Sequence, residues 1–212
     1  AIKKYNNFND KDFEFFIKDE NEINIFLEKI KNIGSLSNRN EKSLLDNSLI
    51  ITKKEEVELI NSWISKNKKV NYKLLYRATR DGDKTQDFHS KCDNVSPILV
   101  IGKTPKGYIF GGYTTINLDY DKYNNQYESD NGAFVFSLNQ KKNFFSNDKK
   151  AIGFVKDYCI IFGNGKNSLQ IENGILTSER HWSNPQGSYG NNLNLTENKN
   201  FSISELEVFH II

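Results

Sequence analysis

The sequence has few cysteines and no long apolar run. Its two cysteines, Cys92 and Cys159, are far apart in a chain of 212 residues, whereas domains held together by disulfides normally use more. No stretch approaches the roughly 18 consecutive apolar residues that a membrane-spanning helix needs. These two absences favour a protein of a reducing compartment, the cytoplasm, that does not insert into a membrane.

Histidine is also scarce, and neither sign of charge dominates. The three histidines and two cysteines are dispersed and form no zinc pattern. Asp119, Asp121 and Asp130 share one loop, but Tyr123 takes the fifth position of a calcium-loop pattern and no glycine takes the sixth. We therefore expect no metal site and no cofactor. The 29 basic and 27 acidic residues nearly balance, which argues against nucleic acid as a partner, because that requires a clustered basic surface.

Aromatic residues are abundant. Fifteen Phe and ten Tyr supply much of a core, because each ring buries a large apolar area. The length suits one β-rich domain with an appendage, or at most two small domains.

Residues 1–43 differ in texture from the rest of the chain and form the first predicted region. Apolar residues recur there in two series that step by seven: Phe16, Ile23 and Ile30, and Phe26 and Ile33. This spacing predicts an amphipathic helix over about residues 10–33. The helix is either the end of a coiled coil, which would mediate self-association, or an ordinary helix packed on the domain.

Two further helices are predicted. The first begins with a capping box formed by Thr52 and Glu55 and ends near Asn67. The second is short and begins at a cap within residues 83–86.

The remainder of the chain is predicted to be strands. The expected ranges are 72–79, 97–103, 108–116, 133–138, 158–162, 168–172 and 203–211. Residues 104–107, Thr-Pro-Lys-Gly, form a turn, so the second and third strands make a hairpin. Many short strands with few helices predict a mainly β member of the α+β class, folded as a sandwich.

Two glycine-containing segments resemble phosphate-binding loops only superficially. Gly111-Gly112 lies inside a predicted strand and Gly163-Asn164-Gly165 follows another, but neither opens a helix or carries the Lys-Ser/Thr of a phosphate loop. Glycine in a strand indicates a bulge or a close backbone approach. Gly-Asn-Gly indicates a tight turn with positive φ.

A cysteine beside a histidine raises the question of thiol chemistry. His89, Cys92 and Asp93 are close in sequence, and a reactive thiol needs a lowered pKa and access to solvent. The predicted short helix places Cys92 on the face of Phe88, which favours a buried structural thiol. A peroxide scavenger or redox sensor that uses Cys92 is the alternative hypothesis.

Six segments, in order along residues 44–212, together resemble one known family. They are LLYRATRDGD at 74–83, FHSKCD at 88–93, GYIFGGY at 107–113, AFVFSL at 133–138 preceded by Asp130, FGNG at 162–165 followed by Leu169, and ELEVF at 205–209. This set is similar to the motifs of the TLDc domain family. Each segment is a weak signal alone, but six in the family's order and spacing are a strong one.

The resemblance implies a sandwich of two antiparallel sheets flanked by helices. It also implies a cytoplasmic protein that contributes to oxidative-stress resistance and binds subunits of the vacuolar proton-pumping ATPase, at the periphery of endolysosomal or vacuolar membranes. No catalytic residues are established for the family, so we expect no enzyme activity. A module for oligomerisation is a further hypothesis.

Exposed charge near these motifs suggests an interaction surface. Arg80, Asp81, Gly82 and Asp83 form a charged turn, and such loops beside a rigid sheet often bind partners. Asp81 or Asp83 is also expected to cap the short helix that follows. In the last strand, alternation places Leu206 and Val208 inward and predicts that Glu205 and Glu207 face water.

Overall fold

The computed structural model describes residues 45, 47–65, 70–123, 125–146, 150–164, 168–184, 186–187, 189–190 and 194–212. The predicted helix over residues 10–33 and its coiled-coil interpretation lie outside these residues. Residues 44–212 form one unit by their internal contacts, and the architecture below is that of this unit.

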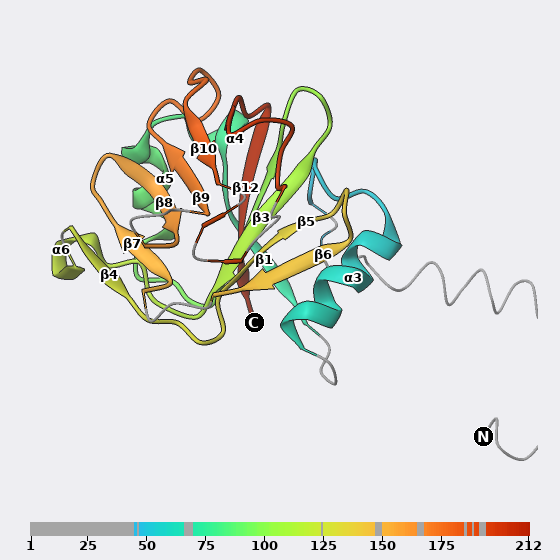
Figure 1. The fold of residues 1–212 in the computed structure, drawn as a ribbon, viewed down its shortest axis with the longest axis horizontal. Coiled ribbons are helices and arrows are strands. Elements are labelled where there is room, and N and C mark those ends of the chain that lie inside the picture. The colour runs from blue at the N-terminus through green and yellow to red at the C-terminus, as the bar shows by residue number, and fades with distance from the viewer. Residues whose placement is uncertain are drawn as a thin grey trace, which may run out of the picture. The chain divides into compact units, whose positions relative to one another are not determined.

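Two antiparallel sheets of six strands each build the fold (Figure 1). The first sheet has the order β1 (Tyr72–Arg77), β12 (Glu205–Ile211), β2 (Ile98–Lys103), β3 (Ile109–Thr114), β5 (Phe134–Ser137) and β6 (Lys142–Phe145). The second has the order β11 (Asn200–Phe201), β10 (His181–Ser183), β9 (Leu169–Glu172), β8 (Tyr158–Phe162), β7 (Ile152–Phe154) and β4 (Gln126–Glu128). The prediction of a mainly β sandwich is confirmed.

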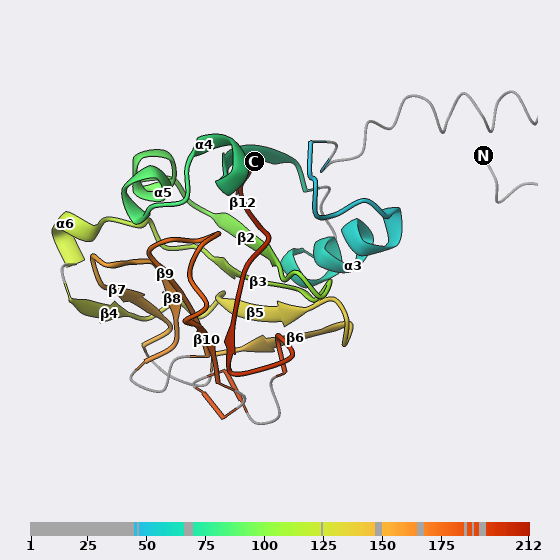
Figure 2. The same cartoon turned by 90° about the horizontal axis from the view of Figure 1, so that it is seen from above.

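In the part of the chain that the structure describes, four helices lie around the sheets. They are α3 (Lys54–Ile64), α4 (Ala78–Asp81), α5 (Thr85–Cys92) and α6 (Tyr120–Tyr123). Helix α3 lies beside the first sheet, on the side away from the second sheet (Figures 1 and 2). Helix α5 contacts both β1 and β8, so it joins the two sheets.

The central strand β2 of the first sheet is buried on both faces. In β2, Ile98 and Val100 belong to the apolar cluster between the two sheets. Their neighbours Leu99 and Ile101 belong to a second cluster with α3 and the segment before it. Each fully buried apolar side chain contributes about 1.5–3 kcal/mol relative to an exposed one. This double burial explains why β2 is continuously apolar rather than alternating.

The boundaries of α3 differ from those predicted. The capping box at Thr52 and Glu55 is wrong, because the N-cap residue is Lys53 and no side chain caps the helix there. The helix ends at Ile64 rather than near Asn67. Burial of Val57 and Ile60 stabilises the helix through its packed face, so a cap is not required.

Some predicted strands are too long, and several strands were not predicted. Strand β1 ends at Arg77, where the turn of helix α4 begins, and β3 ends at Thr114. The strands β4, β6, β7, β10 and β11 contain two to four residues each, which is too short for an alternating pattern to appear. The β2–β3 hairpin is confirmed, with Gly107 at φ +87° in its turn.

Two adjacent glycines of β3 allow close packing. A Cβ on Gly111 would overlap the carbonyl oxygen of Val100 in the neighbouring strand. A Cβ on Gly112 would overlap the ring of Phe162 from the second sheet. Gly163 has φ +113°. The predictions of a close approach in the strand and of positive φ after it are confirmed.

Candidate functional site

A buried ion pair joins the last strand to the first. Glu207 of β12 lies opposite Arg77 of β1 in the ladder and is fully buried. Arg77 Nη2 and Nε lie 2.7 Å and 2.8 Å from Glu207 Oε1. The Leu49 amide donates to the same oxygen at 2.9 Å, and Ser48 Oγ donates to Oε2 at 2.5 Å. Both carboxylate oxygens therefore have hydrogen-bond donors.

This ion pair fixes the segment that precedes α3. Arg77 Nη2 also donates to the carbonyl oxygen of Asn47, so the guanidinium and the Glu207 carboxylate both hold residues 47–49. Ile50 and Ile51, which follow, are buried in the cluster beneath α3. Sequence analysis did not identify Arg77 as a functional residue, although it lies in the first motif segment.

Glu205 is also buried, with 7% of its surface exposed. Its carboxylate accepts hydrogen bonds from the hydroxyl of Thr79, the amide of Thr79 at 3.2 Å and the amide of Leu206 at 3.0 Å. The prediction that Glu205 and Glu207 face water is wrong. Helix α4 covers the first residue and residues 47–49 cover the second, so neither is available as an exposed charge.

The charged turn after β1 is bonded within itself. Arg80 Nε and Nη2 lie 2.9 Å and 2.6 Å from the two carboxylate oxygens of Asp81. Asp81 also accepts the amide of Arg77 at 2.9 Å, so its carboxylate connects the last residue of α4 to the residue that precedes the helix. The hydrogen bonds from Arg80 lower the pKa of the Asp81 carboxyl. Of this pair, Arg80 is the exposed member, with 48% of its side chain accessible.

Neither predicted acid caps α5. Asp83 accepts a hydrogen bond from Thr177 Oγ1 at 3.1 Å, which ties the turn to the segment after β9. The amide of Lys84, at the start of α5, instead donates to Asp87 at 3.2 Å. Gly82 has φ +111°, a conformation in which glycine is favoured. The role of residues 80–83 as an interaction surface stays a prediction.

A groove lies between residues 47–49 and β1. Its volume is about 670 Å³. The lining residues are Asn47, Ser48, Leu49, Tyr72, Lys73, Leu74, Arg77 and Arg80. Leu49 is 60% exposed. The groove therefore has a fixed wall that carries one apolar side chain, opposite a strand with basic side chains.

A second groove, of about 590 Å³, lies beside α5. His89 lies in its lining, with Nδ1 2.9 Å from Asp93 Oδ1 and Nε2 3.1 Å from the carbonyl oxygen of Tyr158. Its ring contacts the ring of Tyr120, with centroids 4.0 Å apart. Both ring nitrogens are engaged, so the imidazole joins α5 to β8.

Cys92 faces away from this groove. It is fully buried in the cluster between the sheets, together with Phe88 and Cys159, which confirms the predicted burial on the Phe88 face. Burial raises the pKa of the Cys92 thiol well above its ordinary value, and burial also raises the pKa of Cys159. The thiol thus lacks both the access and the lowered pKa that reactivity requires.

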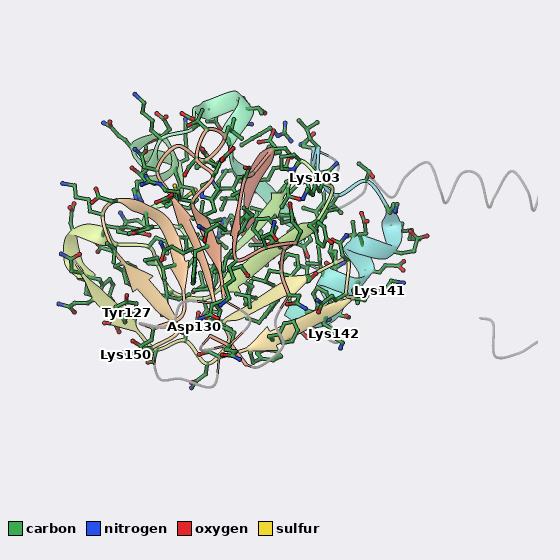
Figure 3. All side chains as sticks on the ribbon, turned by 45° about the horizontal axis from the view of Figure 1, so that its top comes forward. Lys103, Tyr127, Asp130, Lys141, Lys142 and Lys150 are labelled. Carbon is green, nitrogen blue, oxygen red and sulfur yellow. The ribbon has the colours of Figure 1, made fainter. Side chains whose placement is uncertain are left out.

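Asp130, labelled in Figure 3, lies between β4 and β5. Its carboxylate accepts hydrogen bonds from Thr114 Oγ1, from the amide and hydroxyl of Thr115, and from the amide of Gly132, at 2.6–2.9 Å. This acid of the fourth motif segment braces the end of β3. Within the described ranges, no three or more His, Cys, Asp or Glu side chains are grouped so as to hold a metal ion. In the same part of the chain no helix is long and apolar enough to span a membrane.

The fold and these contacts define a β-sandwich module whose buried charged residues connect its strands, helices and loops. The chain belongs to the TLDc domain family, whose model matches residues 45–212. The resemblance found in the six motif segments is thereby confirmed. No curated protein sequence matches the chain.

Proposed function

We propose that this TLDc-type module is a non-catalytic cytoplasmic protein that binds the vacuolar proton-pumping ATPase and contributes in this way to oxidative-stress resistance. Family membership supports the proposal. The observation that carries the proposal is that the charged side chains of the motif segments form bonds within the domain. The charged groups of four motif residues form hydrogen bonds within the domain: Arg77, Glu205, Glu207 and Asp130. These residues stabilise the domain, so we infer that a partner protein is bound by other residues on its surface.

A thiol-based function is supported less well by this geometry. Cys92 has no exposed surface, and its pKa is raised by burial, so the thiolate is disfavoured at neutral pH. Peroxide would reach the sulfur only through opening of the core.

Self-association through residues 10–33 remains part of the proposal. The apolar spacing in that segment is that of a short coiled coil. Sedimentation of the full chain tests this directly, and a monomer at high concentration would rule it out.

The test of pump binding uses the full chain as bait in a lysate of its own organism, followed by mass spectrometry. Three baits are compared: the native chain, the chain with Cys92→Ala, and the unfolded chain. Enrichment of pump subunits on both folded baits supports the proposal. Pump subunits no more abundant than on the unfolded bait overturn it. Loss of capture with Cys92→Ala alone, in a folded protein, indicates a role for the thiol.

A further inference from the structure

The outer edge of β1 has no strand beside it in the part of the chain that the structure describes. Strand β1 is at one end of the first sheet, and its neighbour is β12. The amide of Ile212 donates to the carbonyl oxygen of Asn71 at 3.0 Å. This bond shows that the backbone carbonyl of Asn71 points toward the strand β12. Since backbone groups alternate in direction along an antiparallel pair, Tyr72 and Leu74 direct their N–H and C=O groups outward.

One contact defines where this open edge stops. Arg80 Nη2 donates to the carbonyl oxygen of Leu75 at 3.3 Å. This carbonyl group, which follows Leu74 along the strand, therefore already has a hydrogen-bond donor. The backbone amide of Arg77 is taken by Asp81. The open part of the edge is therefore the stretch Tyr72–Leu74, with Arg80 at its end.

The groove described above runs along this stretch, because Tyr72, Lys73 and Leu74 line it. Its opposite wall, residues 47–49, is held by the buried Arg77–Glu207 pair. A wall fixed in this way lowers the ordering cost of binding, since little conformational freedom remains to be lost. Leu49, 60% exposed, offers an apolar contact on that wall.

Charge selects the kind of segment that fits. Lys73 is exposed and has no ion-pair partner among the described residues. Arg80, half exposed, lies at the end of the open stretch. Two acids beside these residues are already paired, the buried Glu207 with Arg77 and Asp81 with Arg80. Lys73 is therefore the lining cation that has no paired acid among the described residues, and it complements an acidic side chain.

We propose that the edge of β1 binds an extended acidic segment of a partner protein, which adds as a seventh strand to the six-stranded first sheet. Backbone hydrogen bonds to Tyr72 and Leu74 supply affinity, and alternate side chains supply specificity. On the face of Tyr72 and Leu74 the segment carries apolar residues, and on the face of Lys73 it carries acids. This inference rests on the proposed function in one respect, that the chain acts by binding a protein.

The test uses the full chain and two short synthetic peptides, one of alternating valine and glutamate and one of alternating valine and lysine. Binding is measured by fluorescence anisotropy, and hydrogen exchange is followed at the amides of Tyr72 and Leu74. The variant is Lys73→Glu. Its matched control is Lys142→Glu, the same charge change on β6 at the other end of the sheet (Figure 3). Both lysines are exposed, so both variants are expected to fold, which circular dichroism verifies.

We expect the glutamate peptide to bind more tightly than the lysine peptide and to slow hydrogen exchange at both amides. Its binding should weaken as the salt concentration rises. Lys73→Glu should weaken binding about tenfold, while Lys142→Glu should leave it nearly unchanged. Equal binding of both peptides, unchanged exchange at Tyr72 and Leu74, or equal effects of the two variants overturns the proposal. Unchanged exchange in particular would mean that the lysine at the edge serves to prevent strand pairing.

The same variants separate this inference from the proposed function. If the pump is captured equally by the native chain and by Lys73→Glu, pump binding stands and the β1 edge is rejected as the surface used for it. If the glutamate peptide protects the edge but no bait captures the pump, the edge is a peptide site and the proposed partner is wrong.

Discussion

Arg77 and Glu207 face each other across the β1–β12 ladder, and the buried Glu207 carboxylate lies 2.7 Å from Arg77 Nη2. Replacing Arg77 with Ala leaves this carboxylate buried without its counter-charge. We expect the free energy of unfolding to fall by about 3–5 kcal/mol, the cost typical of breaking a buried pair from one side. Urea denaturation of the purified chain measures it.

The control for this prediction removes both charges. In Arg77→Leu/Glu207→Leu no charge remains buried, so a large part of the lost stability should return. Arg77→Ala as stable as the native chain would show that solvent reaches the carboxylate and that residues 47–49 are held by other contacts.

Stability should also depend on pH through His181 of β10. This residue is fully buried, its Nε2 donates to the carbonyl oxygen of Ile175 at 2.9 Å, and its Nδ1 accepts the Glu172 amide at 3.3 Å. These bonds suit the neutral ring, and burial lowers the pKa from its ordinary value of 6.5. Below about pH 6.5 the unfolded chain therefore binds a proton that the folded chain does not.

The expected result is a loss of stability as pH falls from about 6.5 toward the lowered pKa, with a slope of up to about 1.4 kcal/mol per pH unit from this one group. Urea denaturation between neutral and mildly acidic pH measures the slope. In His181→Gln the slope should flatten, whereas His210→Gln, at a half-buried histidine, should keep it. An unchanged slope in His181→Gln would assign the effect to other groups.

The paired glycines of β3 give a prediction with an internal comparison. A Cβ at Gly112 overlaps the Phe162 ring, while a Cβ at Gly111 overlaps the backbone oxygen of Val100. Gly112→Ala should cost about 1–3 kcal/mol, and Gly111→Ala should cost more, because a strand backbone yields less than a side chain. Chemical denaturation of each variant measures the difference.

A second substitution distinguishes the two causes. Phe162→Leu removes the ring and should restore part of the stability lost in Gly112→Ala, so that the double variant is more stable than the sum of the single effects. The equivalent change Phe136→Leu, beside Gly111, should not rescue Gly111→Ala. Rescue of both would mean that the β2 backbone moves readily.

The sequence predicted those parts of the fold that have a strong local signal. Strand β8 has the predicted bounds, Tyr158–Phe162, because it is a continuous run of apolar residues. Strand β6, Lys142–Phe145, was not predicted, since it mixes charged and aromatic residues at the sheet edge and forms through pairing with β5. Such strands depend on tertiary contacts that no local pattern encodes.

The site was less predictable than the fold. Alternation in β12 correctly placed Glu207 and Val208 on opposite faces of the sheet. It gave no information on what covers the face of Glu207, which is why that residue was wrongly expected to face water. That cover is the segment at residues 47–49, about 160 residues earlier, as the Ser48–Glu207 bond shows with its separation of 159 residues. The groove along β1 depends on the same long-range contact, so only the structure reveals it.

The two thiols provide the last prediction. Cys92 and Cys159 have no exposed surface, and burial raises the pKa of both. In the native chain a thiol-specific reagent should therefore react slowly, at a rate limited by opening of the core, and rapidly once the chain is unfolded. Native reaction as fast as that of the unfolded chain would contradict the structure and restore the thiol hypothesis.

The choice of substitution decides whether such an experiment is interpretable. Cys92→Ser introduces a hydroxyl into the apolar cluster formed with Phe88, and an unpartnered buried hydroxyl costs about 1–3 kcal/mol. Cys92→Ala removes the sulfur without adding a polar group, so it should be the more stable variant in urea denaturation. A loss of stress protection in Cys92→Ser but not in Cys92→Ala therefore reports instability, whereas the same loss in both, with Cys92→Ala folded, reports thiol chemistry.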